Sequence, residues 1–122
     1  MPKDTAYTDA QVTEQLRALA GWSVENGMLT RRFDTDGWAT TLMLVNAIGF
    51  LAEAADHHPD LTVTWGTVWV RLATHSAGGI TAKDVALARE IDRLALWRPE
   101  PGGALAGVRR AWVRAGEEAA RR

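Results

Sequence analysis

The chain has 122 residues and a mass of 13.3 kDa, which suits one compact domain and is too short for two ordinary ones. Apolar residues make up 47% and charged residues 24% of the chain, a composition that excludes intrinsic disorder. The absence of cysteine excludes disulfides, thiolate zinc sites, iron–sulfur clusters and cysteine nucleophiles. The formal net charge of −1 disfavours direct nucleic-acid binding through phosphate neutralisation.

The sequence also argues against a membrane segment. No run reaches the roughly 18 apolar residues that a membrane span needs, and the apolar stretch 47–55 is interrupted by Glu53. The first residues lack the basic and then apolar pattern of a secretory signal. We therefore expect a cytoplasmic protein.

The N-terminal third predicts a helix followed by a hairpin. Thr8, with Gln11 three residues later, has the pattern of a capping box, and Gly21 is expected to end the helix. In the segment 22–33, two strand-like runs flank an Asn-Gly pair at 26–27. This pair supplies the two positive-φ residues of a type I′ turn, so the segment is predicted to be an antiparallel hairpin.

A second helix is predicted from Trp38 to about Asp56, because apolar residues recur there at spacings of three and four. Pro59 fixes its end, since a residue before proline is pushed out of the α region. The apolar face of this helix is expected to consist of Trp38, Leu42, Val45, Ile48, Leu51 and Ala55.

Two further strands and a helix follow. The segments 61–65 and 68–72 alternate between apolar and polar residues and predict two strands around a turn near Gly66. Thr81 is expected to cap a third helix, with Asp84 favouring its positive end. The order α-β-β-α-β-β-α implies an α+β domain with a four-stranded antiparallel sheet and helices packed on one face.

The C-terminal part has a different composition. We expect a domain over residues 1–97, then a Pro/Gly linker over 98–103 and a basic extension to residue 122. Residues 98–122 carry six Lys/Arg against three Asp/Glu. From residue 104 onward, the chain is either a short amphipathic helix carrying Leu105, Val108 and Trp112 or a frayed tail.

All three histidines of the chain stand at ends of predicted elements: His57 and His58 end the second helix, and His75 ends the fourth strand. Imidazole gives and takes protons near neutral pH, which makes these residues candidates for acid–base catalysis. Glu53, one helical turn before His57, and Asp56, beside it, could orient an imidazole ring.

The same residues allow simpler interpretations. A His-His-Pro sequence at a helix end can serve as a C-cap, because an imidazolium suits the negative end of the helix dipole. A metal site is less favoured, since the sequence lacks the two-histidine helix spacing of zinc proteases. A serine nucleophile has no Gly-x-Ser-x-Gly motif to support it.

With this arrangement of histidines and carboxylates, the sequence resembles the pterin-4a-carbinolamine dehydratase family. The resemblance covers about residues 8–96 and includes similar pieces around Trp22, at Arg32-Phe33 and at Gly79-Ile80-Thr81. The positions that match the family signature are Glu53, His57, His58, Pro59, Trp65, His75 and Asp84.

The resemblance implies a hydro-lyase that dehydrates 4a-hydroxy-tetrahydropterin to quinonoid dihydropterin in tetrahydropterin recycling, without a metal or other cofactor. It implies a small-molecule pterin ligand, a homodimer or homotetramer, and a pathway connection to an aromatic amino acid hydroxylase. An alternative within the same family is a non-catalytic role as a dimerisation, assembly or transcriptional cofactor.

Carried over position by position, the resemblance makes His57, His58 and His75 the acid–base residues. It makes Glu53 the carboxylate that orients His57, and Thr74 a residue that presents backbone groups to the pterin. The remaining positions that it places around the substrate are Trp22, which could instead be a core residue of the hairpin, Asp84 as an organiser of the helix start, and Pro59 and Gly79 as residues that shape the backbone.

Overall fold

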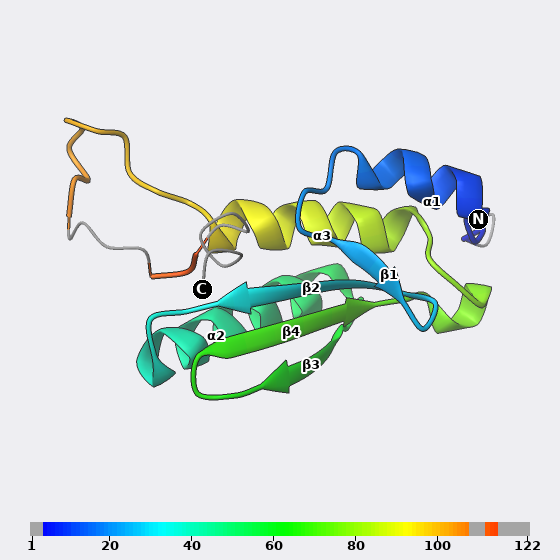
Figure 1. Ribbon diagram of the computed structural model, residues 1–122, viewed down its shortest axis with the longest axis horizontal. Coiled ribbons are helices and arrows are strands. Elements are labelled where there is room, and N and C mark those ends of the chain that lie inside the picture. The colour runs from blue at the N-terminus through cyan, green and yellow to red at the C-terminus, as the bar shows by residue number, and fades with distance from the viewer. Residues whose placement is uncertain (1–3, 108–111, 115–122) are drawn as a thin grey trace.

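The computed structural model describes residues 4–107 and 112–114 of the chain. Their elements follow the predicted order α-β-β-α-β-β-α, with one short 3-10 helix, η1, added after the last strand (Figure 1). The elements are α1 (Asp9–Leu16), β1 (Ser23–Glu25), β2 (Met28–Asp34), α2 (Trp38–Ala55), β3 (Asp60–Val63), β4 (Thr67–Leu72), η1 (His75–Ala77) and α3 (Ala82–Ala95). The predicted α+β class is confirmed.

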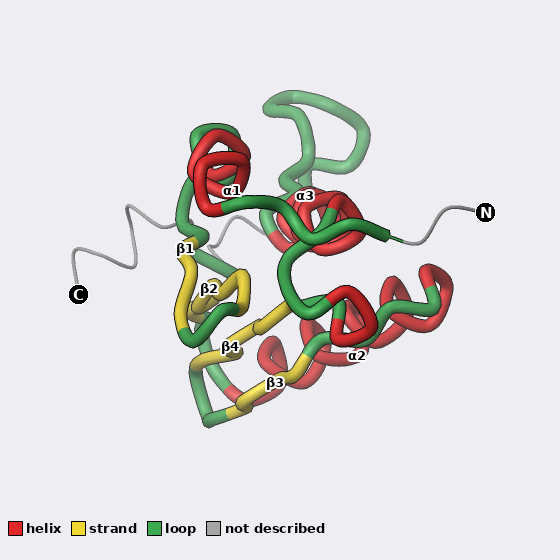
Figure 2. The backbone as a smooth tube through the Cα atoms, turned by 90° about the vertical axis from the view of Figure 1, so that its right-hand side faces the viewer, coloured by secondary structure: helices red, strands yellow, loops and turns green. Residues whose placement is uncertain are grey.

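The strands form one antiparallel sheet in the order β1-β2-β4-β3. Because successive side chains of a strand point to opposite faces, β4 shows which face is covered. Val68, Val70 and Leu72 are fully buried, whereas Trp69 and Arg71 between them are partly exposed. The helices α2 and α3 lie on the same side of the sheet (Figure 2).

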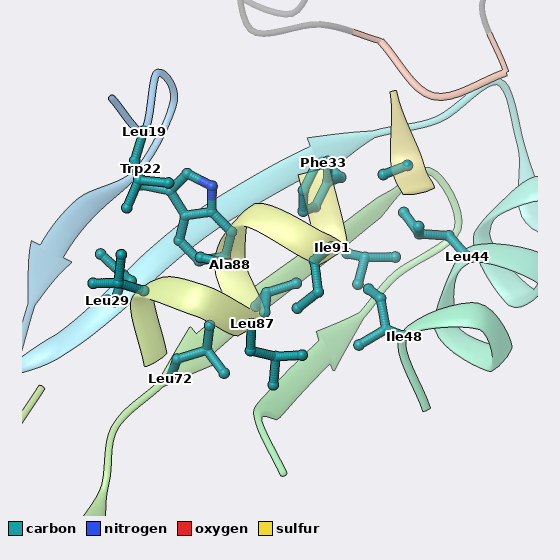
Figure 3. Close-up of a cluster of buried hydrophobic side chains, with 14 of the residues drawn as sticks. Leu19, Trp22, Leu29, Phe33, Leu44, Ile48, Leu72, Leu87, Ala88 and Ile91 are labelled. Carbon is teal, nitrogen blue, oxygen red and sulfur yellow. The ribbon is translucent and has the colours of Figure 1, made fainter. Parts of the chain in front are cut away.

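The core is formed where α2 and α3, next to each other, pack on the same face of the sheet. Figure 3 shows Leu87, Ala88 and Ile91 of α3 near Leu72 of β4 and Ile48 of α2, and all five are at most 5% exposed. Full burial of one such large aliphatic side chain stabilises the fold by about 1.5–3 kcal/mol. The middle of α3 is therefore fixed relative to the sheet and α2.

The N-terminal caps follow the prediction closely. Thr8 forms the capping box with Gln11 at the start of α1, and Thr81 forms a second one with Asp84 at the start of α3. α1 ends earlier than predicted, at Leu16, and the chain then passes through turns to Gly21.

The face of α2 that packs against the core matches the predicted one in part, since Ile48 is buried and Val45 and Leu51 are partly buried against the core. The buried residues are Thr40, Thr41, Leu44, Ile48 and Ala52, whereas Trp38 and Leu42 are 48% and 41% exposed. The helix has no charged residue before Glu53, so its apolar residues surround it and their spacing does not single out one face. By length and composition alone α2 could span a membrane, a test that the core helix of a soluble protein also passes.

The third strand is shorter than predicted. It ends at Val63, and Trp65 lies in the following turn with 68% of its surface exposed. The backbone N–H of Thr64 donates to the carbonyl of Thr67, so the chain already reverses direction where the alternating pattern continues.

The extension after α3 returns to the sheet. Val113 pairs with Thr35 just beyond β2, and its side chain is only 6% exposed (Figure 1). The backbone N–H groups of Asp36 and Arg114 complete this pairing by donating to Trp112 and Asp34. Residues 104–107 and 112–114 are not helical, while Val108 of the predicted short helix lies outside the described residues.

A buried arginine joins the sheet to α3. Arg31 of β2 is 4% exposed, and its Nη1 donates to Asp92 at 3.0 Å and to the carbonyl of Ala20 at 2.8 Å. The indole N–H of Trp22 donates to the same carboxylate at 3.0 Å. Gly21 has a φ of +88°, and a Cβ there would lie 2.7 Å from the guanidinium carbon of Arg31, so the position requires glycine.

Burial raises the pKa of the Asp92 carboxyl, and the charge of Arg31 opposes that shift. Even where desolvation outweighs attraction, removing one partner leaves the other charge buried and unpaired. We predict that Asp92→Ala lowers the free energy of unfolding by about 3 kcal/mol, because it deprives both Arg31 and Trp22 of their acceptor. Urea denaturation checks this value.

The control is Arg93→Ala, which breaks an exposed ion pair with Glu90 on the same helix and should change the free energy of unfolding by less than about 0.5 kcal/mol. Equal stability of the Asp92 and Arg93 variants would contradict the importance of the buried cluster. The double variant Arg31→Met/Asp92→Leu should be more stable than Asp92→Ala, since it removes both buried charges together.

Candidate active site

The end of α2 turns the chain so that the first histidine faces inward. Asp56, the C-cap, adopts the left-handed conformation with a φ of +50°. The backbone N–H of His57 still donates to the carbonyl of Ala52 at 3.1 Å, which holds the turn against the helix. As a result only 13% of the His57 side chain is exposed.

His57 contacts a fully buried carboxylate. Its Nε2 lies 2.5 Å from Oδ1 of Asp84, which is 0% exposed. Asp84 occupies the third position of α3, near the positive end of the helix dipole, which favours a carboxylate. The pair therefore joins the C-terminal end of α2 to the N-terminal end of α3.

Two threonines complete the surroundings of this carboxylate. Oδ2 of Asp84 accepts the Thr74 hydroxyl and the backbone N–H of Thr81, both at 2.8 Å. The two hydroxyls lie 2.7 Å apart, so Thr81 donates to Thr74, which in turn donates to Asp84. Thr74 and Thr81 are 4% and 1% exposed, and the network is closed to solvent on this side.

The network favours one position for the proton of the His57 ring. Oδ2 of Asp84 receives only donors, so an ionised Asp84 would have Oδ1 available to accept the Nε2–H of His57. The Nδ1 atom of the same ring is then the one left to accept a proton. A carboxylate in this position also stabilises the imidazolium that would form.

The second histidine has a different partner. The Nε2 of His58 lies 2.8 Å from Oε1 of Glu53, and these side chains are 56% and 82% exposed. The expectation that Glu53 orients His57 is therefore wrong. A contact between positions four residues apart requires both to be helical, whereas α2 ends at Ala55 and the turn at Asp56 directs His57 towards α3.

The third histidine begins η1 and is exposed. Among the described residues, the His75 ring makes no hydrogen bond or ion pair. Its backbone directly follows Thr74, whose hydroxyl contacts the Asp84 carboxylate that also holds His57. The backbone next to His75 and the ring of His57 are therefore both connected to Asp84. A hydrogen bond holds the His57 ring, whereas none among the described residues holds the His75 ring.

The loop behind His75 is held by its backbone. Thr74 and Gly79 form an isolated antiparallel bridge, with Thr74 donating to the Gly79 carbonyl at 2.9 Å. The Thr74 carbonyl accepts from both Gly79 and Ala77. The backbone groups of Thr74, which we expected to face the pterin, are thus already paired, and its side chain has the organising contact.

Pro59 lies next to the histidines, whereas Trp22 lies in the core. Pro59 is partly buried and links the histidines to β3. Trp22 is 6% exposed, packs edge-on against Phe33 and donates to Asp92, as the alternative interpretation of a core residue predicts. Asp92 is eight residues, or about 12 Å, along α3 from Asp84, which separates Trp22 from the histidine network.

Thr81 was missed as a site residue. The sequence identified it as a helix cap, which is correct, but its hydroxyl also continues the hydrogen-bond chain to Asp84. Within the described residues, no three His, Asp or Glu side chains form a group that could hold a metal ion.

Comparison with known proteins places this arrangement in a family. Residues 5–94 match the family model described as pterin 4 alpha carbinolamine dehydratase. The chain belongs to this family. A dehydratase candidate of Aquifex aeolicus (strain VF5) is 46% identical over 87 residues, which are 71% of this chain and 88% of that protein. One from Mycobacterium sp. (strain JLS) is 44% identical over 71% of this chain and 93% of its own length.

Solved structures of the dehydratase fold carry several names. A transcriptional coactivator/pterin dehydratase from Brucella melitensis superposes with a TM-score of 0.72 at 33% identity, covering 75% of this chain and 99% of its own. A pterin dehydratase-like protein identified as a RuBisCO assembly factor in the alpha-carboxysome gives a TM-score of 0.51 at 25% identity, covering 61% and 86%. Membership of the pterin dehydratase family therefore includes more than one named role.

Proposed function

We propose that this protein dehydrates 4a-hydroxy-tetrahydropterin to quinonoid dihydropterin by acid–base catalysis with His57, His58 and His75. The observation that carries the proposal is the buried Asp84 that holds the Nε2–H of His57, since acid–base catalysis needs a ring fixed in one orientation. Family membership supplies the substrate class.

The reaction breaks the C4a–O bond of the substrate and removes the proton from N5, so that a C4a=N5 double bond forms and water leaves. His57 serves as the base that takes the N5 proton on Nδ1, because Asp84 stabilises the resulting imidazolium. His58 or His75, both exposed, protonates the departing hydroxyl. Each of these proton transfers is typically worth 10²–10⁴-fold in rate.

We further propose that the protein works in the cytoplasm in tetrahydropterin recycling, alongside an aromatic amino acid hydroxylase that releases the substrate. Glu53 then orients His58 rather than His57, which follows from their 2.8 Å contact. The reaction as proposed needs no metal or redox cofactor, since it involves only proton transfer and loss of water.

We also propose that the protein self-associates through α2. Phe50 is 73% exposed, Met43 57% and Leu42 41%, all on the side of the helix away from the core. An apolar helix face of this kind is typical of an interface, and a homodimer or homotetramer would cover it.

The exposed apolar face of α2 also supports an alternative, a non-catalytic role in binding a partner protein. Two structural neighbours are named as a coactivator and as an assembly factor, and α2 offers an apolar surface to which a partner protein could bind. The ordered His57–Asp84 pair favours catalysis, because a protein that acts only as a scaffold does not need an oriented imidazole.

We predict that the purified protein accelerates the loss of 4a-hydroxy-tetrahydropterin in a stopped-flow assay. His57→Ala and His75→Ala should each lower kcat by about 10²–10⁴-fold, because each removes one proton-transfer group. Lys83→Ala is the matched control next to Asp84, since among the described residues the Lys83 side chain makes only an exposed ion pair with Asp4. Wild-type turnover in a His57→Ala/His75→Ala variant would refute the mechanism.

We also predict that Phe50→Glu reduces the oligomeric state, because a charge would be buried without a partner in an α2 interface. Sedimentation velocity measures the change in mass. Trp65→Glu is the control, as this side chain is exposed to a similar extent but lies in the turn between β3 and β4. A wild-type oligomer that survives Phe50→Glu would assign self-association to another surface.

A further inference from the structure

The hydrogen-bond network around Asp84 extends beyond the groups that contact the carboxylate. The backbone N–H of Lys83 donates to the hydroxyl oxygen of Thr81 at 3.2 Å, and this hydroxyl lies 2.7 Å from that of Thr74. Thr74 donates its single hydroxyl hydrogen to Oδ2 of Asp84 at 2.8 Å, so Thr81 is the donor to Thr74. The three hydrogen bonds therefore run in one direction, from the backbone of α3 through two hydroxyls to the carboxylate.

This chain of hydroxyls is shielded from solvent. Thr81 is 1% exposed, Thr74 4% and Asp84 0%. In a buried chain each hydrogen bond polarises the next one, and a group that loses its partner is left unsatisfied. A change in the Thr81 hydroxyl therefore alters the donor that reaches Asp84, although the direct hydrogen bond between these two residues comes from the Thr81 backbone.

The other oxygen of Asp84 connects the chain to the imidazole. Oδ1 lies 2.5 Å from Nε2 of His57, whose side chain is 13% exposed. Two donors on Oδ2 fix the plane of the carboxylate, and this plane determines where Oδ1 meets the ring. The orientation of the His57 ring thus depends on Thr81, with which it shares no hydrogen bond among the described residues.

We propose that Thr81 is a positioning residue for the dehydration. Its hydroxyl acts through Thr74 on Asp84, which in turn holds the His57 ring in the orientation that proton transfer needs. This inference rests on the proposed function, because it assigns Thr81 a role in that same reaction. Since Thr81 is buried, it has no surface for a bound substrate, and loss of its hydroxyl should lower kcat and leave KM nearly unchanged.

The test compares variants of the full chain in the stopped-flow dehydration assay. Thr81→Val keeps the shape of the side chain and should lower kcat about tenfold, the size of one hydrogen bond to a charged group, with KM changed by less than about twofold. Thr81→Ser restores the hydroxyl and should retain most of the wild-type kcat.

The matched control is Thr35→Val, which should leave kcat unchanged. Thr35 is also 1% exposed, and its hydroxyl lies 2.7 Å from that of another buried threonine, Thr41. Thr41 is in the first turn of α2, at the opposite end of the helix from His57. Thr35→Val therefore removes a buried hydroxyl of the same geometry without touching the histidine network.

A double-mutant cycle tests the path from Thr81 to Asp84. Thr74→Val removes the link and keeps the Thr81 cap of α3. It should lower kcat at least as much as Thr81→Val, and the Thr81→Val/Thr74→Val variant should be no slower than Thr74→Val alone. Multiplied effects in the double variant, or Thr81→Ser as slow as Thr81→Val, would overturn the proposal. So would a wild-type kcat in Thr81→Val or, if that variant does not fold, in Thr74→Val.

Spectra of the imidazole rings separate this inference from the proposed function. In long-range ¹H–¹⁵N spectra, the Nε2–H signal of His57 should be present in the wild type and in Thr81→Ser, and should average in Thr81→Val. A wild-type protein that does not dehydrate the carbinolamine refutes the proposed function. A His57 signal that is unchanged in Thr81→Val refutes the positioning role of Thr81 alone, whatever the turnover.

Discussion

The candidate site depends on one buried carboxylate. Asp84 has no exposed surface, and four groups come together because it is there: the ring of His57, the hydroxyls of Thr74 and Thr81, and the first turn of α3. A buried charge is tolerated only when its hydrogen bonds are complete, so these contacts explain both how the helix begins and how the imidazole is oriented. Structure and proposed chemistry thus rest on the same interaction.

Local signals in the sequence were sufficient for most of the fold. The capping boxes at Thr8 and Thr81, the Asn-Gly turn and the alternation of β4 each act within a few residues, and the structure has all of them. The buried face of α2 could be predicted only in part, because an apolar helix presents similar residues on every side and the positions of α3 and the sheet decide which side is covered.

The site, like the fold, was predictable only where local sequence signals determine it. The histidines were found from their types and spacing, whereas their partners depend on tertiary contacts. One left-handed residue, Asp56, directs His57 to Asp84, 27 positions away, and leaves Glu53 for His58. The pairing of Val113 with Thr35 at the end of β2 is likewise a long-range contact. The Pro/Gly-rich segment before it indicates a linker and gives no sign that the chain returns to the sheet.

The central claim is that Asp84 keeps the proton of His57 on Nε2 and leaves Nδ1 able to accept another. Long-range ¹H–¹⁵N spectroscopy of the imidazole rings at neutral pH tests this most directly, because the two ring nitrogens have separate resonances. The account predicts that the His57 ring has a single Nε2–H tautomer, whose proton exchanges slowly with water, and that its pattern averages in Asp84→Ala. A His57 ring protonated on Nδ1, or one that averages freely in the unmodified protein, would contradict it.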